Sequence, residues 1–192
     1  AEKDIDYNKI REEMKESLDN KRYEHTLGVA YTAACLAMRY DYNVQDAMIA
    51  GLLHDCAKCL SDKKRLSICE KNNISVSKTE EKNPSLLHAK VGAYLAAEKY
   101  AVDNEEILKA IRFHTTGKPA MNLLEKIIYI ADYIEPNRKQ APNLEIVRKL
   151  AFEDIDTALI KILSDTLEYL KECNEDMDPL TQETYEYYIN LV

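Results

Sequence analysis

Residues 51–58 read GLLHDCAK, so a histidine and an aspartate, His54 and Asp55, directly follow an apolar run. Helical spacing on the N-terminal side of this stretch predicts that the pair belongs to the end of a buried helix. A carboxylate that is buried without a partner costs several kcal/mol or is forced to stay protonated. The stretch therefore indicates that either an arginine or a metal ion lies beside Asp55 in the folded chain.

The composition of the 192-residue chain favours a folded protein made mostly of helices. Apolar residues make up 46% and charged residues 31%, which is ordinary for a globular domain. Only four glycines and five prolines occur, so few residues are available to end helices or to build tight turns. The length is that of one domain. No apolar run approaches the ~20 residues of a membrane-spanning helix, and we expect no membrane partner.

The net charge of −8 argues against a nucleic-acid partner, because nucleic-acid binding requires a basic face. The net charge does not exclude a small anionic ligand, which needs only a local cluster of arginine and lysine. The five cysteines are an odd number, and no secretory signal precedes them. We therefore expect free thiols in a reducing compartment, the cytoplasm.

Helical periodicity recurs along nearly the whole chain and predicts an all-α fold, a bundle of about eight to ten helices. The predicted helices cover residues 6–19, 22–40, 43–54, 61–72, 83–100, 103–114, 121–135, 144–152, 154–172 and 180–190. Residues 73–83 (NISVSKTEEKN) are predicted to form an exposed loop. No segment alternates polar and apolar residues for long enough to predict a strand.

The four histidines share a setting, since each falls in or at the end of a predicted helix beside apolar neighbours: His25, His54, His88 and His114. One such histidine alone is more simply a hydrogen-bonded core residue, but four in the same setting indicate a common site. Gly28 lies one turn after His25 and removes bulk there, as the close approach of a ligand would require.

Asp132 lies within IIYIADYI (127–134), where the helix is apolar nearly all round. Its carboxylate needs a metal ion or a salt bridge, for which Arg138, Arg112 or a lysine is available. Imidazole nitrogens and carboxylate oxygens together form a ligand set that suits iron, manganese or zinc. The residues thus indicate a metal site but leave a purely structural ion pair open.

Five segments carry a resemblance to the HD-domain phosphohydrolases: RYEHTLGVA (22–30), GLLHDCAK (51–58), HAKVGA (88–93), FHTTG (113–117) and LEKIIYIADYIEPNR (124–138). More narrowly, the chain resembles the symmetrical hydrolases of diadenosine tetraphosphate. A lone His-Asp pair is weak evidence, whereas His, His-Asp and Asp in order across four helices are specific. The resemblance implies a single HD domain over residues 1–192, with the metal-site core at about 20–150 and the C-terminal helices 154–192 packed on it.

The resemblance implies that the primary metal is bound by His25, His54, Asp55 and Asp132. The implied ion is iron, one or two ions with two in the active form, and manganese or zinc are possible substitutes. His88 and His114 would hold either a second metal or substrate phosphates, and both readings stay open. With two ions present, Asp55 would be the bridging carboxylate.

The resemblance also implies a set of residues that face the substrate: Arg22, Asp55, Cys56, Ala57, Lys58, His88, His114, Thr115 and Arg138. Asp55 and Lys58 are the expected catalytic residues. Each of the cations alone could equally be a solvated surface charge, but helical spacing brings Arg22 and Lys58 to the side of expected ligands. The loop CNEDMDP (173–179) is a further candidate to close over a nucleoside, through Cys173, Asn174, Met177 and Asp178.

The implied reaction is attack of a metal-bound hydroxide on phosphorus, which cuts diadenosine tetraphosphate symmetrically into two ADP. The expected partners are therefore a dinucleoside polyphosphate substrate and a nucleoside diphosphate product. A homodimer is a possible assembly, formed by the N-terminal helix and the tyrosine-rich end YEYYINLV (185–192). Packing of these segments within the same chain explains their apolar faces equally well.

Three other readings compete. The chain could be another HD phosphohydrolase that acts on a nucleoside monophosphate or triphosphate. HD hydrolases of guanosine tetraphosphate usually have an acidic pair after the His-Asp motif; this chain has CAKCLSDKK (56–64) there, so that pair is missing. A metal-free regulatory module with a degenerate site should have lost ligands, and none is lost here. A redox or zinc role for Cys56 and Cys59 would need a preceding strand or two further paired ligands, so incidental thiols are favoured.

Overall fold

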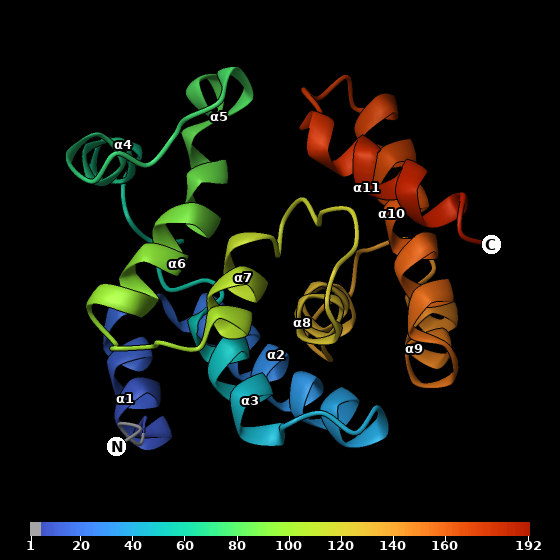
Figure 1. Ribbon diagram of the computed structural model, residues 1–192, viewed down its shortest axis with the longest axis horizontal. Helices are drawn as coiled ribbons and strands as arrows, with labels where there is room; N and C mark the ends of the chain where they lie inside the picture. The colour runs from blue at the N-terminus through green and yellow to red at the C-terminus, as the bar shows by residue number, and fades with distance from the viewer. Residues whose placement is uncertain (1–4) are drawn as a thin grey trace.

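The computed structural model describes residues 5–192, and over this range it contains helices and no strand, which confirms the all-α prediction (Figure 1). The elements in chain order are α1 (Tyr7–Ser17), α2 (Asn20–Arg39), α3 (Val44–Leu53), α4 (Asp62–Lys71), α5 (Lys78–Lys82), the 3-10 turn η1 (Pro84–Leu87), α6 (His88–Glu98), α7 (Glu105–Arg112), α8 (Leu123–Ile134), α9 (Leu144–Glu153), α10 (Ile155–Glu172) and α11 (Pro179–Ile189). Within residues 5–192, none of these helices combines the length and the apolar character needed to cross a membrane.

The prediction of an exposed loop at 73–83 is wrong in its second half, where the short helix α5 forms. Ser77 accepts a hydrogen bond from the backbone N–H of Glu80 at 3.2 Å, and the Glu80 carboxylate accepts one from the backbone N–H of Ser77 at 2.8 Å. This capping box begins the helix. Glu80 is buried and pairs with Lys90 of α6 at 2.9 Å, which holds the segment against the bundle. The Ser-x-x-Glu signal for this helix is present in the sequence.

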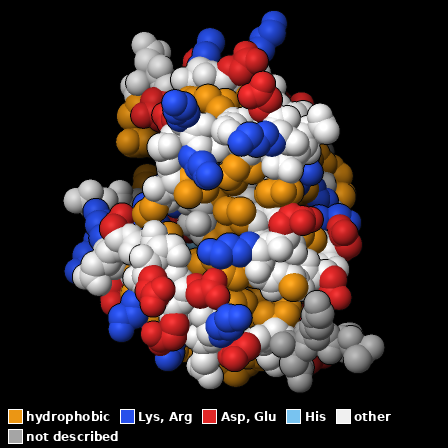
Figure 2. All heavy atoms as spheres, turned by 90° about the vertical axis from the view of Figure 1, so that its left-hand side faces the viewer, with side chains coloured by type: hydrophobic (Ala, Val, Ile, Leu, Met, Phe, Trp, Pro, Cys, Tyr) orange, Lys and Arg blue, Asp and Glu red, His pale blue; other side chains and the backbone are white. Residues whose placement is uncertain are grey.

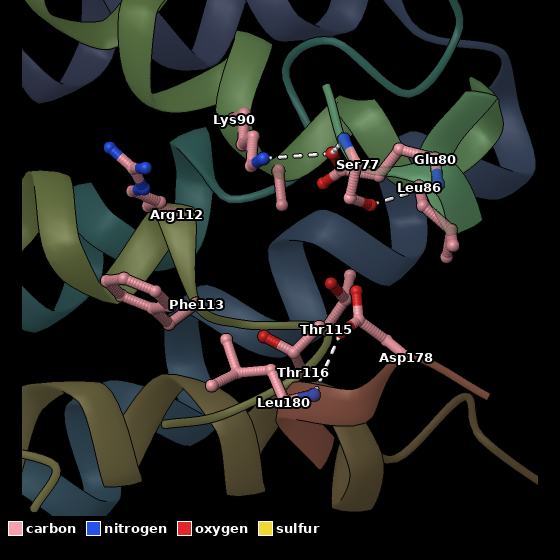
Figure 3. Close-up of a pocket in the computed structure, with 11 residues that line it drawn as sticks. Ser77, Glu80, Leu86, Lys90, Arg112, Phe113, Thr115, Thr116, Asp178 and Leu180 are labelled. Carbon is pink, nitrogen blue, oxygen red and sulfur yellow. Dashed lines mark hydrogen bonds and ion pairs between the residues drawn. The ribbon is translucent and has the colours of Figure 1, made fainter. Parts of the chain in front are cut away.

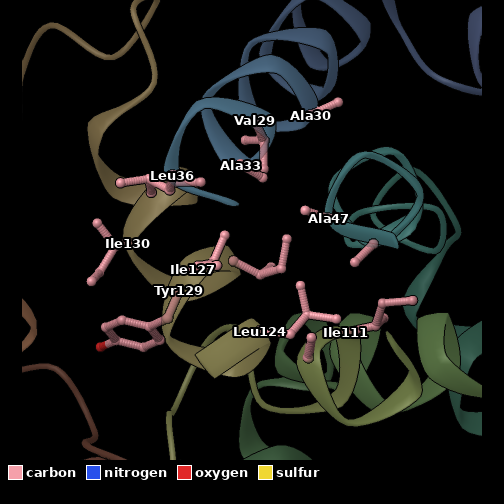
Figure 4. Packing of buried hydrophobic residues seen from close by; sticks show 14 of the residues in the cluster. Val29, Ala30, Ala33, Leu36, Ala47, Ile111, Leu124, Ile127, Tyr129 and Ile130 are labelled. Atoms are coloured by element: carbon pink, nitrogen blue, oxygen red, sulfur yellow. The ribbon is translucent and has the colours of Figure 1, made fainter. Parts of the chain in front are cut away.

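One cluster of buried apolar side chains extends from Ile10 in α1 to Tyr188 in α11. Figure 4 shows side chains of α2, α3, α7 and α8 meeting in its centre. The buried face of α2 includes Ala30, Ala33 and Ala37, whose small side chains allow neighbouring helices to approach closely. The C-terminal helices are tied to this core in part through Tyr188, whose hydroxyl accepts a hydrogen bond from the backbone N–H of Met121 at 2.7 Å.

Helix α3 carries the His-Asp pair into the interior. Its last three residues, Gly51 to Leu53, are buried, and His54 follows them as the C-cap with no exposed surface. Helix α8 begins at a capping box between Asn122 and Glu125, which fixes the face on which Asp132 lies. The start and stop signals of these two helices therefore set which side chains point toward the centre.

The outer surface on the side of α1 and α4 carries interspersed positive and negative side chains with apolar patches between them (Figure 2). Basic residues on this face do not gather into a continuous stripe. This face therefore offers no broad basic surface of the kind that nucleic-acid binding requires.

We predict that Gly51→Ala destabilises the fold, because a Cβ on Gly51 would lie 2.7 Å from the Cα of Ala30 in the backbone of α2. Backbone atoms cannot rotate out of the way, so we expect the free energy of unfolding to fall by about 1–3 kcal/mol. Gly92→Ala is the matched control, since its Cβ would lie 3.4 Å from the Cγ2 of Ile111 and the change should stay below about 1 kcal/mol. Urea unfolding of both variants can be monitored by circular dichroism. Equal urea midpoints would contradict the predicted contact.

Candidate metal centre

Four imidazoles and two carboxylates from five parts of the chain converge on one place in the interior. The Nε2 of His25 in α2 lies 2.9 Å from Oδ1 of Asp132 in α8. The Nε2 of His54 lies 3.4 Å from Oδ2 of Asp55, and those of His88 and His114 lie 3.3 and 3.4 Å from its Oδ1. Three overlapping groups of these residues each have potential ligand atoms within 4.8 Å of one another. The structure thus brings together all six residues that the sequence singles out as metal or phosphate ligands.

The outward-facing ring nitrogens fix the orientation of the four imidazoles. Nδ1 of His54, His88 and His114 lies 2.6 Å from the backbone carbonyl oxygen of the residue three positions earlier, namely Gly51, Ser85 and Ile111. Nδ1 of His25 lies 3.0 Å from Oε1 of Glu135. Each acceptor assigns a proton to Nδ1, so that Nε2 is the ring nitrogen directed at the centre and, in the neutral ring, offers its lone pair to a cation. Metal-binding histidines in proteins are commonly held in this way.

The inward-facing atoms fit a metal ion. The Nε2 atoms of His88 and His114 face each other at 3.1 Å, and two lone pairs at this distance repel unless positive charge lies near them. The Nε2 atoms of His25 and His54 are buried without a well-formed hydrogen bond within the described residues. Such unsatisfied groups are costly in a protein interior, and a cation that accepts their lone pairs removes the cost.

The electrostatics of the centre also favour positive charge. Burial lowers the pKa of His54, but the carboxylates of Asp55 and Asp132 outweigh it and raise the pKa to about 10. Burial raises the pKa of Asp55 and of Asp132, yet the surrounding histidines hold both pKa values well below the usual range. The centre therefore keeps two negative charges inside the protein, and its nitrogen and oxygen donors suit a divalent metal ion.

Asp55 lies between two groups of ligands. Its Oδ2 faces Arg22, His25 and His54, whereas its Oδ1 faces His88 and His114. Asp55 is 3% exposed, so both carboxylate oxygens must be satisfied inside the protein. This arrangement allows one carboxylate to serve two neighbouring positions.

The cations expected near the substrate are engaged with the carboxylates of the centre. Arg22 donates to Oδ2 of Asp55 at 2.8 Å, and Arg138 lies 3.5 Å from Oδ1 of Asp132. The salt bridge between Arg138 and Asp132, which the sequence leaves as an alternative to a metal, therefore exists beside the histidines. Lys58 is half-buried, and burial lowers its pKa. Within residues 5–192 its ammonium has no hydrogen bond or ion pair, so it can interact with a bound anion.

Cys56 and Ala57 turn their side chains away from the centre into the apolar core. The Sγ of Cys56 donates to the carbonyl oxygen of Gly92 at 3.5 Å, and burial raises the pKa of the thiol to about 12. Any contact of these two residues with a substrate would therefore come from their backbone. All five cysteines are free, as the sequence predicts.

Thr115 lines a cavity of ≈ 260 Å³, which we call the Thr115 cavity; Ala89, the residue after His88, also lines it. Its wall includes Lys90, Arg112, Phe113 and Asp178, so one of the four candidate residues of the C-terminal loop lines it (Figure 3). Cys173, Asn174 and Met177 are not part of this wall. Cys173 and Asn174 are exposed at the end of α10, and Met177 is half-buried.

Glu135 is a site residue that the sequence reading missed. It is buried, and besides His25 it accepts a hydrogen bond from the backbone N–H of Asn137 at 2.9 Å. A Cβ on Gly28 would collide with its Oε2. The space beside Gly28 is therefore filled by Glu135. The expectation that Gly28 makes room for a ligand was wrong in this respect. The signal in the sequence was a glutamate at the apolar end of α8, just before Pro136.

Arg148 fixes the turn that follows α8. It donates to the carbonyl oxygens of Ile134, Glu135 and Arg138 at 2.8, 3.0 and 2.9 Å. The turn carries Glu135, which orients His25, and Arg138, which pairs with Asp132. Arg148 therefore fixes the backbone on which both of these residues lie.

Comparison with known proteins places this geometry in a family. The HD domain model matches residues 22–137. The symmetrical bis(5'-nucleosyl)-tetraphosphatase of Bacillus subtilis (strain 168) is 42% identical over 177 residues, covering 92% of this chain and 94% of that protein. The protein of the same description from Staphylococcus aureus is 35% identical over 185 residues, covering 94% and 93%. A crystal structure of a predicted HD superfamily hydrolase involved in NAD metabolism from Clostridium acetobutylicum has a TM-score of 0.93 and 41% identity, covering 97% of this chain and 98% of that one.

We predict that Glu135→Ala weakens metal binding about 10–100-fold, because it removes the acceptor that orients His25. The dissociation constant can be measured by competition with a chelating dye, and circular dichroism should show an unchanged helix content. The control is Glu153→Ala, which removes an exposed glutamate of α9. An unchanged metal affinity in the Glu135 variant would show that His25 does not need this support.

Proposed function

The chain belongs to the HD-domain family and, within it, to the symmetrical bis(5'-nucleosyl)-tetraphosphatases, and on that premise we propose that it hydrolyses diadenosine tetraphosphate at the central bridge into two ADP. The observation that carries the proposal is the set of four imidazoles whose Nε2 atoms all face the carboxylates of Asp55 and Asp132. Relatives that match nearly the whole chain share the activity in their description. The substrate class is accordingly a dinucleoside polyphosphate and the product a nucleoside diphosphate.

The proposed primary metal ligands are His25, His54, Asp55 and Asp132. We propose iron as the ion, with manganese or zinc as substitutes, because imidazole and carboxylate donors suit all three. His88 and His114 would hold a second ion, with Asp55 as the bridging ligand. The two-sided setting of Asp55 and the facing Nε2 atoms of these two histidines support two ions. When bound, the metal supplies a nucleophile at neutral pH and positive charge for the phosphate oxygens.

The chain's own residues would orient the polyphosphate and stabilise the charge that develops on it. Arg22 and Arg138 fix the carboxylates of Asp55 and Asp132 and present their remaining N–H groups to phosphate. Lys58 would place its unpaired ammonium near the bridging oxygen of the breaking bond. A nucleoside diphosphate is a good leaving group, so the reaction does not require a strong general acid. Asp55 and Lys58 are thus the proposed catalytic residues.

The Thr115 cavity is the proposed place of one nucleoside. Its wall includes Ala89 and Thr115, which directly follow His88 and His114 in the chain, and Asp178 at the start of α11. Thr115 can bind a phosphate or sugar oxygen through its hydroxyl. Of the C-terminal loop, Asp178 is the residue best placed to contact the ligand, and Cys173, Asn174 and Met177 would do so only if the loop moved.

The five free thiols support a reducing compartment, and we propose the cytoplasm. A homodimer would use the C-terminal end, where Tyr187, Ile189 and Leu191 are exposed. The N-terminal helix is a poorer candidate, because Ile10 and Met14 of α1 are buried in the core of the same chain.

The product of the reaction tests the proposed activity. With iron or manganese supplied, the chain should convert diadenosine tetraphosphate into ADP alone, because attack beside the central bridge releases two equal halves. Chromatography of the nucleotides gives the answer. AMP together with ATP would contradict symmetrical cleavage, and faster hydrolysis of a nucleoside monophosphate would favour a nucleotidase instead.

Lys58→Ala should lower kcat about 100-fold while leaving the metal content unchanged, because the ammonium is proposed to act on charge that develops in the transition state. Lys63→Ala is the matched control, since Lys63 is an exposed lysine of α4. The measurements are steady-state kinetics and metal analysis of the purified variants. A kcat within twofold of the wild type would remove Lys58 from the catalytic residues.

A further inference from the structure

A second cavity adjoins the metal centre at His25, which forms part of its wall. It measures ≈ 590 Å³ and is lined by the start of α2 and the turn after α8, including Lys21, Arg22, Arg138 and Lys139. We call it the basic cavity. Arg22, in its wall, contacts Oδ2 of Asp55. The Thr115 cavity is lined by Ala89 and Thr115, which follow His88 and His114, and these two histidines face Oδ1. The basic cavity thus borders the Oδ2 side of Asp55, and the Thr115 cavity is lined by chain neighbours of the two histidines on its Oδ1 side.

The charges of the basic cavity favour an anion. Its four cations face two carboxylates, those of Glu24 and Glu135, and Glu135 is already engaged by His25 and the backbone of Asn137. Arg22 and Arg138 hold carboxylates of the metal centre. Within residues 5–192, the exposed ammonium groups of Lys21 and Lys139 have no ion pair, so they are available to bind phosphate oxygens.

A symmetrical substrate has two identical nucleoside diphosphate halves, so cutting its central bridge requires a place for each half at a similar distance from the reacting phosphorus. The proposed function uses only the Thr115 cavity for a nucleoside. Resting on that function, we propose that the basic cavity binds the second nucleoside diphosphate half, with Lys21 and Lys139 on its phosphates. Anchoring both halves would centre the middle bridge at Asp55 and so determine where the chain of phosphates is cut.

A third cavity of ≈ 200 Å³ shares Gln140 with the basic cavity and offers a place for the base. Its wall includes Tyr133 and Tyr169, whose rings can stack on a purine. It also includes the buried carboxylate of Asp165, which accepts hydrogen bonds from Asn143 at 2.9 Å and Lys161 at 2.7 Å. A carboxylate retains further lone pairs, and these can accept the exocyclic amine of adenine.

The number of ADP molecules bound per chain tests the second site without turnover. Equilibrium dialysis of the metal-loaded wild type should give two ADP per chain, and the Lys21→Ala, Lys139→Ala double variant should give one. The KM of this variant for diadenosine tetraphosphate should rise about tenfold, as expected for lost charge-assisted contacts. Lys63→Ala should retain both ADP molecules. A single ADP on the wild type, or two on the double variant, would overturn the proposal.

Tyr169→Ala tests the placement of the base. Tyr169 is 52% exposed, so its removal should leave the fold intact. One of the two ADP dissociation constants, the one that Lys21→Ala, Lys139→Ala also affects, should rise about tenfold, as for one lost stacking contact. Tyr31→Ala, which removes a 51% exposed tyrosine of α2, should change neither constant. Unchanged ADP binding in Tyr169→Ala would exclude the base from this cavity.

These measurements separate the inference from the proposed function. Symmetrical hydrolysis with only one ADP bound per chain would retain the hydrolase and reject the second site. Two ADP bound with no hydrolysis of diadenosine tetraphosphate would reject the activity and retain the site.

Discussion

The buried carboxylate of Asp55 is the constraint on which the structure of the centre depends. It is almost without contact with water, yet it remains charged because imidazoles and the guanidinium of Arg22 surround it. A charge in this position is tolerated only where the groups around it are fixed in advance. Residues in or next to α2, α3, α6, α7 and α8 form these surroundings. The chemistry of the centre therefore depends on how these helices pack.

The four imidazole rings are oriented by two kinds of hydrogen-bond acceptor, and which kind is used depends on the position of the histidine in its helix. His54, His88 and His114 lie at helix ends, where backbone carbonyls remain available, and each uses the carbonyl three residues earlier. His25 lies inside α2, where helical hydrogen bonds use the carbonyls. It therefore needs an acceptor from elsewhere in the chain, which is Glu135. That contact in turn requires a glycine at position 28.

The cavities near the centre match the extended shape of the proposed substrate. The basic cavity meets the centre at His25 and Arg22, and the Thr115 cavity is lined by the residues that follow His88 and His114. In the basic cavity the two arginines bind carboxylates of the centre, and the two lysines are free to bind phosphate. A polyphosphate with a nucleoside at each end matches such an arrangement better than a mononucleotide does. The position of the cut would then be set by where the two ends are held, in addition to the reactivity of the central bridge.

The sequence by itself determined most of the helices, because helical periodicity and caps are local properties of the chain. It also singled out the six converging residues, through their apolar surroundings and through the motifs that carry the family resemblance. It also contained the capping box of α5, although the polar composition of residues 73–83 concealed it. Only the tertiary structure decided that Arg22 and Arg138 hold carboxylates, that Glu135 orients His25, and that Gly28 makes room for Glu135. His25 and Glu135 are 110 residues apart in sequence, and no local pattern relates them. Such contacts follow from how α2 and α8 pack against each other, which depends on the whole core.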